Sequence, residues 1–88
     1  MELRCVSRFY GIAIYLYGND HNPPHFHAKY AGGDAAIELA TLTILAGDLP
    51  ERALSMVEEW AALHQAELVQ AWNRLQTGQA PESIDPLP

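Results

Sequence analysis

The apolar segments in the first half of this chain are joined by connections that are too short to contain a helix. Aromatic and branched side chains fill residues 8–17, and turn-forming residues separate the apolar segments. Parallel strands need a crossover of about a dozen residues or more, which these connections cannot supply. The sequence therefore predicts an antiparallel meander of about four strands, over residues 8–17, 25–30, 35–39 and 42–45.

An apolar stripe at helical spacing marks the second half of the chain. It begins at Ala53, passes through Trp60 and His64, and ends at Leu75. Because the stripe stays in phase across His64, the sequence predicts one long helix over residues 49–77 rather than two helices.

The two ends of this helix carry start and stop signals. Asp48 is a candidate N-cap, and Gly78 is a candidate C-cap. Residues 79–88 contain three prolines and are expected to form a loop or an extended segment that docks on the domain. At 88 residues the chain has room for one core. The expected fold is a single α+β domain over residues 1–88, with the long C-terminal helix packed on one face of the meander.

Three histidines, His21, His25 and His27, fall within seven residues. Two consecutive prolines stiffen the loop that follows His21, because each fixes its own φ angle. Residues 25–30 alternate like a half-buried strand, so His25 and His27 are expected on one face and Phe26 on the other, towards the helix. A rigid loop and a strand thus bring three imidazoles together, which makes this run the strongest candidate for a site.

The three histidines have three interpretations. Their ring nitrogens could bind zinc or another divalent ion, with Asp20 as a further ligand or as a group that orients one imidazole. An ion of this kind lowers the pKa of a bound water to about 7 and enables hydrolysis. The histidines could instead transfer protons without a metal, or they could hold the shape of the proline turn by hydrogen bonding to it.

His64 and Arg8 are weaker candidates. His64 lies on the apolar stripe, so it is expected to be a core histidine whose partner is a backbone group or a tyrosine. Arg8 could bind a phosphate or a carboxylate group, and it could equally form an ion pair with Asp20 or Glu38. The candidate catalytic residues are therefore His21, His25 and His27, followed by Arg8.

Four segments of the chain resemble one small bacterial family that is described as a domain of unknown function. They are residues 7–12 (SRFYGI), 20–28 (DHNPPHFHA), 47–50 (GDLP) and 59–64 (EWAALH). The resemblance covers nearly the whole chain, from about Val6 to Leu87, and the NPPHFHA string is its most recognisable part. It implies a gene that lies beside another gene for a small protein, in an arrangement like that of toxin–antitoxin modules. It implies no catalytic residues.

Charge and cysteine content limit the partners and the compartment. Eleven acidic residues against five basic ones give a formal net charge of −6. Because the basic residues are scattered along the sequence, direct nucleic-acid binding is not expected. A single cysteine fits a reducing compartment, and the N-terminus lacks the apolar core of a signal peptide. No apolar stretch is long enough to cross a bilayer, so a cytoplasmic protein is expected.

Two functions from different classes are consistent with these features. The first is a small cytoplasmic interaction protein, one component of a toxin–antitoxin-like pair, which forms a homodimer or binds the protein encoded next to it. This function rests on the acidic charge, on the family's gene arrangement, and on the segment 8–17, which is apolar on both sides and needs cover. The second is a metal-dependent or histidine-based hydrolase, with RNA as one candidate substrate, that uses His21, His25 and His27.

Overall fold

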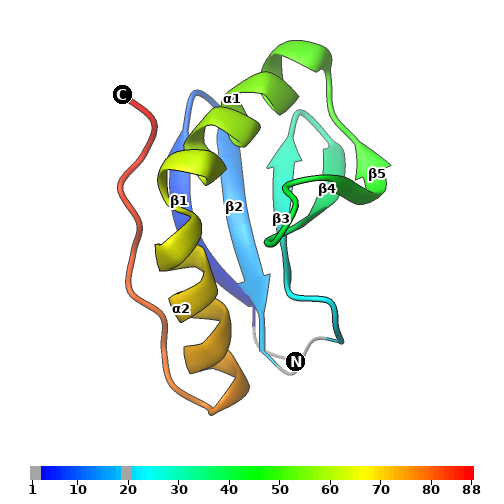
Figure 1. The fold of residues 1–88 in the computed structure, drawn as a ribbon. Helices are drawn as coiled ribbons and strands as arrows, with labels where there is room; N and C mark the ends of the chain where they lie inside the picture. The colour runs from blue at the N-terminus through cyan, green and yellow to red at the C-terminus, as the bar shows by residue number, and fades with distance from the viewer. Residues whose placement is uncertain (1–2, 19–20) are drawn as a thin grey trace.

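A five-stranded antiparallel sheet and two helices form the layers of the structure, a computed structural model that describes residues 3–18 and 21–88 (Figure 1). The strands follow one another across the sheet in chain order. Their bounds are β1 (Leu3–Phe9), β2 (Ile12–Tyr17), β3 (His25–Tyr30), β4 (Gly33–Glu38) and β5 (Ile44–Asp48). The helices are α1 (Glu51–Leu63) and α2 (Gln65–Gln76). The predicted α+β class and the antiparallel meander are confirmed.

The sheet has one more strand than predicted, because the chain turns inside the segment 8–17. Tyr10 and Gly11 have φ angles of 49° and 80°, so both lie in the left-handed region. Two consecutive residues in this conformation form the tight hairpin turn that joins β1 to β2. The prediction of a single strand over residues 8–17 is therefore wrong. Both sides of the segment are apolar, so its pattern gave no sign of the turn.

The predicted long helix is interrupted at one residue. His64, with φ −120° and ψ 23°, separates α1 from α2, so the prediction of one helix over residues 49–77 is wrong in this detail. The Nδ1 of His64 hydrogen bonds to the carboxylate of Glu67 at 2.6 Å and fixes the junction. The partner of this histidine is thus a glutamate rather than the expected backbone group or tyrosine. Both helices keep their apolar sides towards the sheet, since Trp60 of α1 and Leu68 of α2 are buried.

The start of α1 also differs from the prediction. β5 begins and ends later in the sequence than the predicted strand 42–45. Leu42 (φ 59°) lies in the turn that precedes β5 rather than in the strand. Asp48 is consequently the last residue of β5, and its carboxylate accepts a hydrogen bond from the backbone N–H of Leu49 at 2.8 Å. The helix begins after Pro50 without a side-chain cap, so the prediction that Asp48 is the N-cap is wrong.

The core is centred on Trp60, whose side chain is 0% exposed. Its ring lies 5.3 Å from the ring of Phe9 and 6.1 Å from that of Phe26, measured between centroids. Its Nε1–H donates to the carbonyl of Asp85 at 2.7 Å, which satisfies the polar end of the indole. Trp60 therefore ties α1 to two strands and to the C-terminal segment.

The C-terminal segment, residues 79–88, docks on the domain. Figure 1 shows it running beside the helices and β1. The backbone N–H of Ile84 donates to the carbonyl of Val6 on β1 at 2.8 Å, and the Ile84 side chain is buried in the core. Of the two predicted forms, loop or docked extended segment, the docked one is found.

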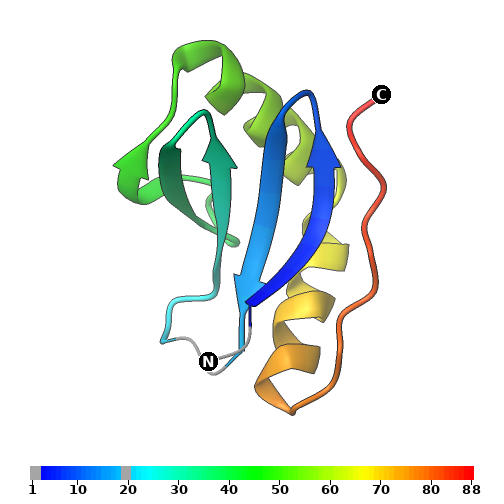
Figure 2. The same ribbon diagram turned by 180° about the vertical axis from the view of Figure 1, so that it is seen from behind.

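The helices cover only one face of the sheet. Figure 2 shows the strands in front and both helices behind them. Ile12, Ile14 and Leu16 of β2 are buried on the helix side, whereas Tyr15 and Tyr17 lie half-buried on the other side. We call this second side the open face. In the described part of the chain, neither helix has the length and apolar character needed to cross a bilayer.

Candidate functional site

One row of paired side chains crosses the middle of the open face. Tyr15 of β2 pairs with His27 of β3, and His27 pairs with Ala36 of β4. Ala36 in turn pairs with Ala46 of β5. Residues paired in this way point to the same face of a sheet. Alanine side chains are small, so they leave a hollow in the open face over β4 and β5, beside the larger side chain of His27.

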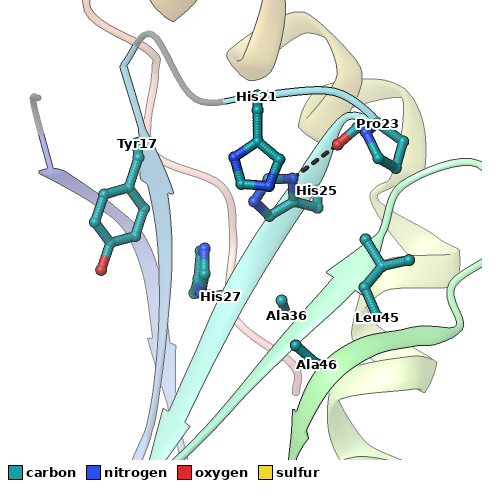
Figure 3. Close-up of a pocket in the computed structure, with 8 residues that line it drawn as sticks. All are labelled: Tyr17, His21, Pro23, His25, His27, Ala36, Leu45 and Ala46. Atoms are coloured by element: carbon teal, nitrogen blue, oxygen red, sulfur yellow. Dashed lines mark hydrogen bonds between the residues drawn. The ribbon is translucent and has the colours of Figure 1, made fainter.

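A pocket of about 450 Å³ lies over these alanines (Figure 3). Ala36 and Ala46 form its floor, and larger side chains from β2, β3, β5 and the loop before β3 form its walls. The wall residues are Tyr17, His21, Pro23, His25, His27 and Leu45. The pocket is within the size range of small-molecule sites in proteins. It brings the three predicted histidines together, and their catalytic role stays a prediction.

His25 stands in the middle of the three imidazoles. Its ring centroid lies 5.3 Å from that of His21 and 5.1 Å from that of His27. The Nδ1 of His25 lies 2.7 Å from the carbonyl oxygen of Pro23 and donates a hydrogen bond to it. A neutral imidazole that carries its proton on Nδ1 keeps its lone pair on Nε2. The proline loop therefore sets the tautomer of this ring.

Burial also fixes His25, whose residue is only 4% exposed. Its ring lies 5.4 Å from that of Trp72 of α2, so it contacts the helix layer as well as the pocket. The prediction that both strand histidines face away from the helix is thus right for His27 but incomplete for His25.

His27 is held from two sides. The Tyr17 ring meets it edge-on at 4.7 Å between centroids, and its Nδ1 lies 3.4 Å from the carboxylate of Asp34 on β4. A carboxylate or carbonyl on one ring nitrogen orients an imidazole and leaves chemistry to the other nitrogen. His25 and His27 share this arrangement, with Nδ1 turned to a protein acceptor in both.

The predicted metal site is only partly within the described residues. Asp20, the fourth predicted ligand, lies outside them. Within residues 3–18 and 21–88, no three His, Cys, Asp or Glu side chains are grouped so as to hold one metal ion. Zinc binding by His21, His25 and His27 together with Asp20 therefore stays a prediction.

Arg8 lies next to the pocket rather than in it. Its Nη2 donates to the hydroxyl of Tyr15 at 3.2 Å, and its guanidinium carbon lies 6.0 Å from the centre of the Tyr15 ring. The Nζ of Lys29 lies 4.9 Å from the same centre. Tyr15 thus holds two cations on the open face, one strand away from His27. A tyrosine was not among the predicted partners of Arg8.

Sequence reasoning missed the apolar half of the pocket. Tyr17, Leu45 and the two floor alanines come from strands that only the sheet register brings to the histidines. Small side chains at outward-facing strand positions, Ala36 and Ala46, were the one available signal of a hollow.

Comparison with known proteins gives a family and no function. Residues 11–73 match the family model described as Domain of unknown function (DUF4160). The chain belongs to this family. No curated protein and no solved structure gave a match. The DUF4160 match includes every residue of the pocket, whereas all of β1 and the C-terminal segment lie outside it. The pocket is therefore made entirely from the part of the chain that defines the family.

Proposed function

We propose that this DUF4160 protein is a small cytoplasmic interaction protein, one component of a two-gene module of the toxin–antitoxin type, and that it binds its partner through the open face. The observation that carries the proposal is that helices and C-terminal segment cover one side of the sheet and leave the other, with its apolar pocket, facing solvent. Apolar surface gathered in one place on a small domain is typical of a binding site.

The composition of the open face supports a protein partner. Leu45 is 45% exposed at the rim of the pocket, and Tyr17 and Pro23 stand on its other sides. Tyrosine and apolar side chains around a depression resemble the centre of protein interfaces, where a partner's side chain fills a pocket. The gene arrangement implied by the family resemblance favours the neighbour-encoded protein over a second copy of this chain.

Sedimentation velocity tests this proposal. We expect the chain alone to sediment as one species and to form a larger complex when the protein encoded by the adjacent gene is added. A chain that remains a monomer at high concentration and ignores the neighbouring protein would contradict the proposal. Self-association without the neighbour would assign the open face to a second copy instead.

The second candidate function is a metal-dependent or histidine-based hydrolase. It is favoured by the meeting of three imidazoles in one pocket and by the acceptors that orient two of them. Imidazoles held in this way are common in acid–base and metal sites. In such an enzyme the neighbour-encoded protein, by covering the open face, would block the pocket.

A further inference from the structure

The described residues of the pocket offer proton-transfer groups rather than the usual hydroxyl, thiol or carboxylate nucleophile close to them. Its described lining contains three histidines and no serine, threonine, cysteine or carboxylate. Tyr17 supplies a hydroxyl, but Figure 3 shows this hydroxyl pointing away from the three imidazole rings. Hydrolysis of an ester or amide by a covalent route needs an activated nucleophile from the protein. The imidazoles of this lining can act as a general base and a general acid, which suits a substrate that carries its own nucleophile.

Single-stranded RNA is such a substrate, because each ribose carries a 2′-hydroxyl next to the phosphodiester. We propose that the histidine pocket cleaves single-stranded RNA by transesterification. This inference rests on the second candidate function and is independent of whether a partner protein binds.

The step balances without an added reagent. One imidazole takes the proton of the 2′-hydroxyl, and the 2′-oxygen forms a bond to phosphorus. The bond between phosphorus and the 5′-oxygen of the next nucleotide breaks, and a second imidazole gives a proton to that oxygen. The products are a 2′,3′-cyclic phosphate and a free 5′-hydroxyl. The enzyme has lost one proton and gained one.

The arrangement of the rings indicates which two imidazoles can act on opposite sides of one phosphate. Attack and departure take place on opposite sides of the phosphorus, so the two imidazoles must flank the phosphate. His21 and His27 are the outer rings, with His25 between them. We assign His21 as the base and His27 as the acid. Because Nδ1 of His27 faces Asp34, its proton exchange with substrate takes place at Nε2. His25, buried and bonded to Pro23, positions its two neighbours.

The fold also provides a surface for the RNA strand, which the scattered basic residues of the sequence did not predict. Arg8 and Lys29 both pair with Ala13, so they lie in one row across the open face, beside Tyr15. Cations track a phosphate backbone, and exposed aromatic rings stack on unpaired bases. Asp34 and Asp48 continue the same row on β4 and β5, so the cations are confined to its β1–β3 part. Many of the other acidic residues lie elsewhere, on or near the helix surface or on the C-terminal segment: Glu51, Glu58, Glu59, Glu67, Glu82 and Asp85.

The test uses the full chain and a single-stranded RNA oligonucleotide that contains every dinucleotide step. We expect cleavage that leaves 2′,3′-cyclic phosphate ends, identified by mass spectrometry, and that persists in EDTA. DNA of the same sequence should stay intact, because it lacks the 2′-hydroxyl. His27→Gln should reduce the cleavage rate about 100-fold or more, the usual effect of losing one proton-transfer group. His64→Gln, purified in parallel, should leave the rate unchanged and controls for contaminating nucleases.

Four results would overturn the inference. They are an intact RNA with folded wild-type protein, equal cleavage of DNA, loss of cleavage in EDTA, and a His27→Gln variant as active as wild type. If His27→Gln does not fold, His21→Gln replaces it, since His21 lies on an exposed loop. An intact RNA together with a complex in sedimentation would reject this inference and leave the interaction proposal standing.

Discussion

Replacing Trp60 with alanine is expected to lower the free energy of unfolding by about 3–5 kcal/mol. The indole is fully buried, packs against Phe9 and Phe26, and donates its N–H to the carbonyl of Asp85. The substitution would leave a cavity between the helix layer and the sheet and would release the C-terminal segment. Domains have total stabilities of about 5–15 kcal/mol, so a large share of the stability of this small domain would be lost.

Urea denaturation followed by circular dichroism measures this loss. Leu63→Ala is the matched control, because Leu63 lies on the same helix but is 65% exposed. Its effect should stay within about 0.5 kcal/mol. A Trp60→Ala variant whose denaturation midpoint equals that of Leu63→Ala would show that the helix does not pack on the sheet as described.

Replacing Gly47 with alanine is expected to be the most disruptive change in the sheet. Gly47 has a φ angle of 75°, and a Cβ at this position would lie closer to the backbone oxygen of Asp34 than any van der Waals contact allows. The left-handed conformation alone costs a residue with a side chain about 1–3 kcal/mol. The clash with a paired strand adds to that cost, because backbone cannot move aside like a flexible side chain.

Gly32→Ala separates these two contributions. Gly32 has a similar φ angle of 83°, but no atom lies within 4 Å of the position that a Cβ would take there. We expect Gly47→Ala to be clearly less stable than Gly32→Ala in thermal denaturation, with the difference due to the clash. Equal stabilities would mean that β5 does not approach β4 as closely as the structure has it. Since β5 carries Leu45 and Ala46, we also expect Gly47→Ala to distort the pocket.

Helices and strands whose apolar residues recur at a regular spacing could be predicted from the sequence. Features that depend on the backbone conformation of single residues could not. β3 has the predicted bounds, because Phe26 and Ala28 alternate with His25 and His27. The turn at Tyr10 escaped prediction because a tyrosine seldom adopts a positive φ angle. Helical spacing also could not reveal the single non-helical residue between two helices whose stripes stay in phase.

Part of the candidate site could likewise be predicted from the sequence, and part could not. The grouping of the histidines follows from local geometry, since His25 and His27 are two residues apart on one strand and His21 precedes a short loop. Leu45 and Ala46 join them only through the register of β4 with β5, which no local pattern encodes. The sequence therefore predicted the polar part of the pocket, and the fold added the apolar part.

The central claim, that the open face binds the partner, is tested most directly by comparing Leu45→Glu with Val69→Glu. The two residues are similarly exposed, at 45% and 42%, but Leu45 lines the pocket on the open face. Val69 lies on α2, beside a second apolar groove formed with Leu39 and Trp72 on the helix side. The pair thus compares the two sides of the molecule with the same chemical change.

Isothermal titration calorimetry with the neighbour-encoded protein gives the measurement. We expect Leu45→Glu to weaken binding about tenfold or more, because the interface loses apolar contact and must bury a charge. Val69→Glu should keep the wild-type affinity within about twofold, as is usual for residues outside an interface. Normal binding by Leu45→Glu together with a large loss for Val69→Glu would contradict the claim and move the interface to the helix side.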